Sequence, residues 1–142
     1  MVTSRPATLD DEPRVLALLQ QLLEDETPDP LRWSAGYRLI VAGDRGTALV
    51  AEDTDRVLGC ITVSYNLAVR YGGEYAQIEE LIVDQAARGK NVGAALVNAA
   101  IDAARARGCQ EIGLYSRETT RAFYEKLGFR YAGPELRLPL KE

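Results

Sequence analysis

The feature that most constrains this fold is an apolar strand that leads through a short loop into a long helix. The strand is predicted at residues 74–83, which carry apolar side chains at Ile78 and from Leu81 onward. The helix is predicted at residues 91–107, because apolar residues recur there at helical spacing and Gly108 stands at the usual stop position. A strand and a long helix in direct succession belong to a fold that mixes both kinds of element.

Similar signals predict further elements on both sides of this unit. Helices are predicted at residues 31–41 and 117–127, and after Asp10, which we expect to cap a helix that ends at Leu23. The remaining strands are predicted at residues 2–8, 47–52, 56–69, 111–115, 129–132 and 136–140. This order indicates a mixed α/β fold, with about seven strands in one sheet and helices on both faces. The length fits one domain spanning residues 1–142.

The absence of histidine removes whole classes of chemistry. Serine–histidine and cysteine–histidine nucleophiles and histidine-based zinc sites are excluded, and we expect no metal. The 17 basic and 21 acidic residues give a net charge of −4, which argues against a nucleic-acid surface. No stretch reaches the ~18 apolar residues of a membrane span, and residues 1–6 lack the apolar core of a secretory signal. With two cysteines at no ligand-like spacing, the sequence predicts a cytoplasmic protein that acts on a small molecule.

The loop between the strand and the long helix has the features of an anion-binding site. The first turn of a helix presents backbone N–H groups without a partner, together with the positive end of the helix dipole. Gly89 and Gly93 leave this backbone open to close approach, and Arg88 and Lys90 add positive charge. The glycine spacing fits neither a dinucleotide-binding fingerprint nor a P-loop. The same residues also fit a plain β–α turn with two solvated cations.

Two motifs in this order resemble those of a known family. The segment from Arg88 to Gly93 resembles the Q/R-x-x-G-x-G/A signature of the GNAT N-acetyltransferase superfamily. The segment from Phe123 to Phe129 resembles the second signature of that superfamily, and the opening Arg5-Pro6-Ala7-Thr8 resembles its common start. The likeness covers nearly the whole chain, and two motifs in the correct order are more specific than either alone.

The resemblance implies a twisted mixed sheet in which two adjacent parallel strands, ending near Val83 and Tyr115, splay apart. Acetyl-coenzyme A (acetyl-CoA) would be the co-substrate, with its pantetheine arm in the gap and its pyrophosphate in the loop. The residues expected to contact it are Leu81, Ile82, Val83, Arg88, Gly89, Lys90, Asn91, Val92, Gly93, Ala94, Ser116 and Tyr124.

Two positions depart from the family pattern. Asn91 stands where the signature usually has its first glycine. Because asparagine tolerates a positive φ better than any other residue except glycine, we expect the loop to keep its shape. Arg117 replaces an asparagine that commonly contacts the cofactor arm in this family, and Ser116 or Arg117 itself would have to replace that contact.

Acetyl transfer to an amine needs an acid for the leaving thiolate and a base for the amine proton, because an amine of pKa near ~10.4 is almost wholly protonated at pH 7. The resemblance implies that Tyr124 lies beside the thioester sulfur and acts as the acid; the alternative is that Tyr124 only packs with neighbouring aromatic rings. Glu79 and Glu80 are the candidates for the base. Adjacent strand residues face opposite sides, so we expect only one of them to face the site. In the polyamine acetyltransferases, which are similar, the carboxylate matching Glu79 is thought to take the proton through water, which favours Glu79 over an ion-paired Glu80.

Two further features bear on the acceptor. The acidic run of Glu24, Asp25, Glu26 and Asp29 either borders a site for a cationic acceptor or is a solvated turn. The aromatic residues Trp33, Tyr37 and Tyr65 either line an acceptor pocket or belong to the core.

The resemblance thus implies an acetyl-CoA-dependent N-acetyltransferase that acts on the primary amine of a small molecule, by direct attack in a ternary complex. The alternatives are transfer to a protein N-terminus or lysine, a non-catalytic acyl-CoA sensor, and an unrelated nucleotide-binding module. Partners in the form of membrane or nucleic acid are not expected. Members of the superfamily often pair through their last strands, so a homodimer would form through residues 129–140.

Overall fold

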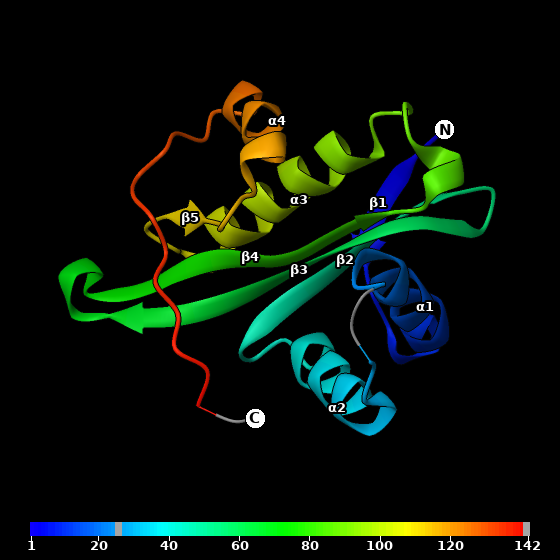
Figure 1. Cartoon of the computed structure of the whole chain (residues 1–142), viewed down its shortest axis with the longest axis horizontal. Coiled ribbons are helices and arrows are strands. Elements are labelled where there is room, and N and C mark those ends of the chain that lie inside the picture. Colours follow the sequence, from blue (N-terminus) through cyan, green and yellow to red (C-terminus); the bar gives the residue numbers. More distant parts are fainter. Residues whose placement is uncertain (25–26, 141–142) are drawn as a thin grey trace.

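The computed structural model describes residues 1–24 and 27–140, and its centre is one five-stranded sheet (Figure 1). The strands lie in sequence order across the sheet: β1 (Thr3–Pro6), β2 (Gly46–Asp53), β3 (Arg56–Ala68), β4 (Gly73–Val83) and β5 (Ile112–Gly113). Neighbouring strands from β1 to β4 are antiparallel, whereas β4 and β5 are parallel. The sheet is therefore mixed, as the sequence predicts.

Helices cover both faces of this sheet (Figure 1). α1 (Glu12–Leu22) and α2 (Pro30–Val41) pack on one face, and α3 (Val92–Arg107) and α4 (Arg121–Lys126) pack on the other. Short 3-10 turns join these elements: η1 (Leu9–Asp11), η2 (Val69–Tyr71), η3 (Gln85–Ala87) and η4 (Glu118–Thr120). The prediction of a mixed α/β fold with helices on both faces is confirmed. Among the described residues, no helix has the length and apolar character needed to cross a membrane.

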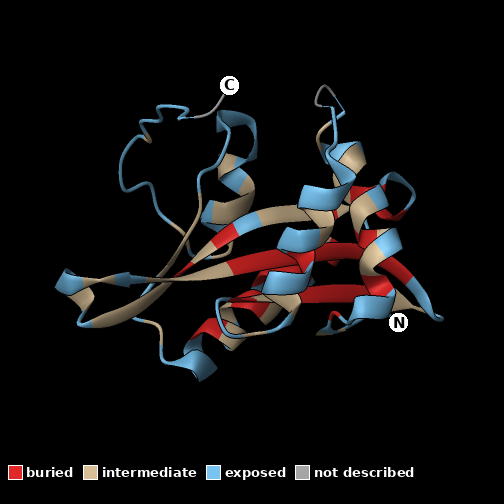
Figure 2. Cartoon of the chain, turned by 90° about the horizontal axis from the view of Figure 1, so that it is seen from below, coloured by how far each residue is buried: buried red, intermediate tan, exposed pale blue. Residues whose placement is uncertain are grey.

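An apolar core on each face holds the layers together. Ile61 on β3 is fully buried against α3, which contributes Leu96. On the other face, Cys60 is buried together with Leu18 of α1. This alternation along β3 follows from the period of two in a strand. Figure 2 shows burial concentrated in the middle of the strands, whereas the far end of the β3–β4 hairpin and the C-terminal segment are exposed.

Gly59 on β3 lets α3 approach the sheet closely. A methyl group at this position would lie 2.7 Å from the carbonyl oxygen of Ile82, and 3.1 and 3.3 Å from the side chains of Leu96 and Val92. Val92 and Leu96 belong to the first turns of α3. The missing side chain at Gly59 therefore sets how closely the N-terminal end of α3 lies against β3 and β4.

The two strands predicted at residues 129–132 and 136–140 are not formed, so the sheet has five strands rather than about seven. A strand needs a neighbour with free ladder groups, and β5 pairs through only two residues. Pro134 and Pro139 donate no backbone hydrogen bond, and Gly133 turns the chain with a φ of +136°. The leucines whose alternation suggested a strand remain exposed: Leu136, Leu138 and Leu140.

A buried carboxylate fastens β1 to the start of α1. The Arg5 guanidinium donates two hydrogen bonds of 2.9 Å to Asp11, and the Thr8 N–H donates one of 2.8 Å. Thr8 and Asp11 form a capping box, so the prediction that Asp10 caps the helix was wrong. The hydrogen bonds from Arg5 hold the pKa of Asp11 below its ordinary value.

We expect Asp11→Asn to lower the free energy of unfolding by about 2 kcal/mol at pH 7, because it removes the charged acceptor of two Arg5 hydrogen bonds and leaves Glu52 as the carboxylate partner of Arg5. The depressed folded-state pKa means that the contribution of Asp11 is complete above the unfolded carboxyl pKa near ~3.9, and is lost as the pH falls through the lower folded-state value. Urea denaturation at pH 7 and pH 3 measures this difference, which must shrink at pH 3. An equal difference at both pH values, or an equal loss in the exposed neighbour variant Asp10→Asn, contradicts the assignment.

Candidate active site

β4 and β5 pair over a short length and then separate. The pairing joins Ala76 and Gln77 of β4 to Ile112 and Gly113 of β5. Beyond it, residues 78–83 run along β3 on one edge and have no strand on the other edge among the described residues. The predicted splay of two parallel strands is confirmed. It leaves backbone N–H and C=O groups of β4 open to a ligand.

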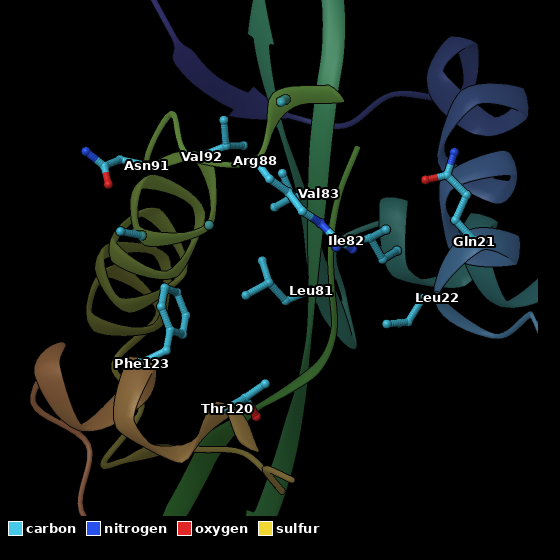
Figure 3. A pocket seen from close by; sticks show the side chains of 14 residues that line it. Gln21, Leu22, Leu81, Ile82, Val83, Arg88, Asn91, Val92, Thr120 and Phe123 are labelled. Carbon is cyan, nitrogen blue, oxygen red and sulfur yellow. The ribbon is translucent and has the colours of Figure 1, made fainter. Parts of the chain in front are cut away.

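A cleft of about 450 Å³ follows this open edge (Figure 3). Leu81 points toward Phe123 of α4, and Ile82 points to the opposite side, toward Leu22 at the end of α1. The cleft therefore reaches around the edge of β4, between the helices of the two faces. Its lining consists of Gln21, Leu22, Leu81, Ile82, Val83, Ala87, Arg88, Gly89, Asn91, Val92, Gly93, Ala94, Thr120 and Phe123.

The N-terminal turn of α3 opens into this cleft. The first hydrogen bond of the helix runs from the Ala95 N–H to the Asn91 carbonyl, at 3.1 Å, and the N–H groups of residues 92–94 have no acceptor among the described residues. Asn91 has a φ of +60°, so the expectation that asparagine keeps the loop in shape is confirmed. Free donors at the positive end of a helix dipole suit a phosphate group.

Asp84 anchors the start of the loop between β4 and α3. Its carboxylate accepts a hydrogen bond of 3.1 Å from the Ala86 N–H and so caps η3. Arg14 of α1 donates to the same carboxylate at 2.6 Å, which lowers the pKa of Asp84, and Arg56 donates at 3.4 Å. Arg14 also donates twice to the Val57 carbonyl, at 3.0 and 3.1 Å. This group of contacts holds α1, β3 and the loop together at the end of β4.

Glu79 and Glu80 lie on the same face of the sheet, so the expectation that these adjacent residues face opposite sides was wrong; neither of them lines the cleft. Thr62 pairs with Glu80, but the next residue of β3 pairs with Ile78, which makes Glu79 the extra residue of a β-bulge. Thr62 donates a hydrogen bond to Glu80, and Ser64 donates one of 2.6 Å to Glu79. Since Thr62 and Ser64 are two residues apart on one strand, both carboxylates lie on the face that α1 and α2 cover.

The surroundings of the two carboxylates differ. Glu80 is half-buried, and burial raises its pKa although the hydrogen bond from Thr62 acts in the opposite direction. Glu79 is exposed. Neither forms an ion pair with a lysine or arginine in residues 1–24 and 27–140. A carboxyl group of raised pKa beside an exposed carboxylate is suited to proton transfer.

Tyr124 follows the cleft residue Phe123 on α4 but does not line the cleft itself. Its ring meets that of Phe123 edge-on, with centroids 4.9 Å apart, and that of Phe129 at 5.8 Å. Burial raises the pKa of the phenol, so the group is neutral at physiological pH. No described residue forms a hydrogen bond with its hydroxyl group. The hydroxyl oxygen is also not fully buried, because no fully buried polar side-chain atom among the described residues lacks a partner. The hydroxyl therefore opens onto space outside the core.

These features agree with the comparison of the whole chain with known proteins. Residues 13–129 match the sequence pattern of the Acetyltransferase (GNAT) family. The chain belongs to this family. The GNAT chain is 33% identical over 134 residues to the probable glucosamine 6-phosphate N-acetyltransferase 2 of Oryza sativa subsp. japonica, a match that covers 89% of this chain and 80% of the rice protein. It is an N-acetyltransferase.

Two solved structures share the fold over almost the full length of this GNAT protein. A transcriptional regulator from Bacillus halodurans C-125 is 29% identical, with a TM-score of 0.85, and the match covers 99% of this chain and 100% of the other. Glucosamine-6-phosphate N-acetyltransferase from Arabidopsis thaliana is 22% identical, with a TM-score of 0.83 and a coverage of 99% of both chains. The second likeness shows the fold alone.

Most residues that the GNAT resemblance assigned to acetyl-CoA lie along the cleft. They are Leu81, Ile82, Val83, Arg88, Gly89, Asn91, Val92, Gly93 and Ala94. Lys90, Ser116 and Tyr124 are not part of its lining. Lys90 is an exposed residue of the same loop, and Ser116 shares a hydrogen bond of 2.7 Å with Thr120, which does line the cleft.

Sequence reasoning missed the other lining residues of this GNAT site, which are Gln21, Leu22, Ala87, Thr120 and Phe123. Gln21 and Leu22 follow the buried Leu18 by three and four positions, so they share its side of α1. That spacing is a signal that could have identified them. Phe123 reaches the cleft because its ring packs beside Gly93, 3.4 Å from where a Cβ atom would stand. No local signal in the sequence predicts this contact.

Two aromatic candidates for an acceptor pocket have structural roles instead. Tyr37 is buried, and its hydroxyl donates to the Thr8 carbonyl at 2.5 Å. Tyr65 shares a hydrogen bond of 2.6 Å with Thr47, and the Arg107 guanidinium lies 4.2 Å from its ring centre. These contacts join neighbouring elements and use up the polar groups of both side chains.

The acidic run after α1 is only partly described. Asp29 caps α2 by accepting a hydrogen bond of 3.1 Å from the Arg32 N–H. Asp25 and Glu26 lie outside the described residues. In the part of the chain that the structure describes, no three acidic or cysteine side chains are grouped as metal ligands would be.

Proposed function

We propose that this protein transfers the acetyl group of acetyl-CoA to the primary amine of a small molecule, by direct attack within a ternary complex. The observation that carries the proposal is the open edge of β4, which leads directly to the free amides of α3. A strand edge offers partners to the amides of a pantetheine arm, and a helix N-terminus offers donors to a pyrophosphate. Acetyl-CoA contains both groups in that order.

Acetyl-CoA supplies the activated thioester, and the chain orients it. We propose that the backbone of residues 81–83 aligns the arm, while the amides of residues 92–94, with Arg88 and Lys90, bind the pyrophosphate. Direct attack is supported by the state of the cysteines. Cys60 is fully buried, where its pKa is raised to about 12, and Cys109 does not line the cleft. Neither is placed as a nucleophile that would carry the acetyl group.

Proton transfer is assigned to groups on two sides of the gap. We propose that a carboxylate of the β4 bulge, Glu79 or Glu80, removes the proton from the ammonium group of the acceptor, which frees the nitrogen lone pair. We propose that Tyr124 gives its proton to the departing thiolate. Its neutral phenol supports this role, as does a hydroxyl that no described residue engages.

For the acceptor, we propose an amino sugar phosphate as the compound to test first. The name of the rice relative supports this choice. Arg137, in the C-terminal segment, gives a second reason. Its pKa is raised mainly by its hydrogen bonds to Glu135, and the charges of Tyr115 and Glu79 act in the same direction. We propose that the largely exposed Arg137 guanidinium binds an anionic group of the acceptor.

We expect Arg137→Gln to raise the KM for glucosamine 6-phosphate about tenfold, because one charge-assisted contact to the phosphate is lost. The kcat should stay within about twofold, since Arg137 takes no part in proton transfer. Steady-state kinetics with glucosamine, which lacks the phosphate, provides the comparison. An equal rise in KM for both compounds contradicts a phosphate contact.

The proposed function is tested by the release of free thiol from acetyl-CoA over a panel of acceptors. The panel contains glucosamine 6-phosphate, glucosamine, polyamines, aminophosphonates, amino acids and lysine-containing peptides. Release with a small amine supports the proposal. Release with peptides alone indicates a protein acetyltransferase, and acetyl-CoA binding without release on any compound indicates a sensor; either result overturns it.

We also propose that the chain forms a homodimer through its C-terminal segment, in the cytoplasm. The exposed leucines of that segment, between 81% and 94% accessible, support pairing with a second copy. Both cysteines are free thiols, which supports a reducing compartment. Sedimentation equilibrium of the full chain tests the first statement: a monomer at all concentrations contradicts it.

A further inference from the structure

Three polar side chains follow one another along one face of β3: Thr62, Ser64 and Asn66. The Asn66 Nδ2 donates to the Ser64 hydroxyl at 3.0 Å, and that hydroxyl donates to the Glu79 carboxylate at 2.6 Å. Because a lone pair of the Ser64 oxygen is occupied by Asn66, the hydroxyl proton is directed toward Glu79. The exposed carboxylate of Glu79 is therefore positioned by Ser64, which is itself oriented by Asn66.

Thr62 fixes the neighbouring Glu80 carboxylate through two hydrogen bonds of its hydroxyl group. The Glu80 N–H donates to the Thr62 hydroxyl at 3.1 Å, and the same hydroxyl donates to the Glu80 carboxylate. Thr62 is itself buried, with 8% of its surface accessible, and pairs with Glu80 across the two strands. The Glu80 side chain is thus fixed by its own backbone through one buried hydroxyl group.

We propose that Ser64 and Thr62 are positioning residues that give the two carboxylates different tasks, an inference that rests on the proposed function. Ser64, oriented by Asn66, aims Glu79 at the ammonium group of the arriving acceptor. Thr62 holds Glu80 where it takes the proton: an N–H bond of the ammonium group breaks, an O–H bond forms on Glu80, and the nitrogen keeps the electron pair for the attack.

The charges around the bulge fit this division. Glu80 is acted on by Glu79 on its own strand and lies close to Cys60 on β3. Burial, and then the charge of Glu79, raise the pKa of Glu80, which brings a carboxyl group closer to neutral pH and makes it a better base. Glu79 is exposed, which leaves its carboxylate accessible to a cationic acceptor.

The two roles predict different kinetic effects. We expect Ser64→Ala to raise the KM for the acceptor about tenfold with kcat within about twofold, and Asn66→Ala to cause a smaller rise of the same kind. We expect Thr62→Val, which keeps the shape of the side chain, to lower kcat about tenfold. It should also move the acidic limb of the kcat/KM profile to higher pH, because the hydrogen bond that favours the charged form of Glu80 is lost.

The chain offers a matched control for each change. Ser34→Ala removes another serine–glutamate hydrogen bond, of 2.9 Å to Glu12, between α2 and α1. Thr47→Val removes the hydroxyl group of another threonine in a strand, on β2, which shares a hydrogen bond with the Tyr65 hydroxyl. Neither hydroxyl group forms a hydrogen bond with Glu79 or Glu80, so both variants should keep the KM, kcat and pH profile of the wild type.

The inference is overturned if Ser64→Ala and Thr62→Val produce the same kinetic change, or if neither differs from its control. A readout without turnover separates it from the proposed function. In a carbon-13 NMR titration of the glutamate carboxyls, Thr62→Val must raise the pKa of Glu80 and Ser64→Ala must leave it unchanged. If the wild type released no thiol with any acceptor, the proposed function would fail, and this titration would still decide the role of Thr62: equal shifts in both variants overturn it.

Discussion

Replacing Tyr124 with phenylalanine is expected to lower kcat about a hundredfold while the affinity for acetyl-CoA stays unchanged. The substitution keeps the ring that packs against Phe123 and Phe129, and it removes only the hydroxyl group. Without that group, the thiolate must leave without a proton donor beside it. Thiol release measures kcat, and calorimetric titration with the coenzyme measures the affinity.

The control for this variant is Tyr131→Phe. Tyr131 also has a ring in contact with another side chain, since the Arg121 guanidinium lies 4.7 Å from its centre, but it is exposed and lies in the C-terminal segment after α4. It should keep the activity of the wild type. If Tyr124→Phe retained full kcat, the acid would have to be water or another group, and Tyr124 would be left with packing alone.

Gly59→Ala is expected to lower the free energy of unfolding by about 3 kcal/mol, at the upper end of the usual cost of overpacking a core. The added methyl group would stand 2.7 Å from the Ile82 carbonyl oxygen, which is backbone and cannot turn aside as a side chain can. It would also push Val92 and Leu96, so the N-terminal end of α3 would move away from β4. Urea denaturation measures the stability, and coenzyme titration should show weaker binding as well.

Gly36→Ala is the matched control, because it makes the same chemical change in open space. Gly36 lies inside α2, and no atom would come within 4 Å of the new methyl group. In a helix interior, alanine is more favourable than glycine by about 0.5–1 kcal/mol, so this variant should be slightly more stable. If both variants changed stability alike, close packing at Gly59 would not be the reason for its glycine.

The central strand, the loop and the long helix could be predicted from the sequence because each of them carries its own local signal. Apolar positions and the stop at Gly108 predicted a helix at residues 91–107, and α3 spans Val92–Arg107. The positive φ of Asn91 and the free amides behind it follow from helix geometry and from the preferences of one residue type. No distant contact is needed to produce them.

The β-bulge could not be predicted, because it is decided by how two strands pair rather than by either strand alone. The alternation rule places Glu79 and Glu80 on opposite faces, and only the register with Thr62 and Ile78 shows that one residue is extra. The face of the sheet on which Glu79 lies is thus decided by the pairing of β3 with β4, and not by the sequence of β4 alone. The missing last strands have a similar origin, because alternating leucines specify a strand only where a neighbour offers an edge.

The unpaired edge of β4 also affects how the protein behaves without its ligand. Apolar, β-favouring residues such as Leu81, Ile82 and Val83 beside free ladder groups form a template onto which another chain adds, and many proteins protect such an edge with proline or charge. Protection of that kind would close the same groups to the coenzyme. We expect the coenzyme, bound as proposed, to cover this edge, so solutions of the purified protein should aggregate more slowly when the coenzyme is kept in the buffer.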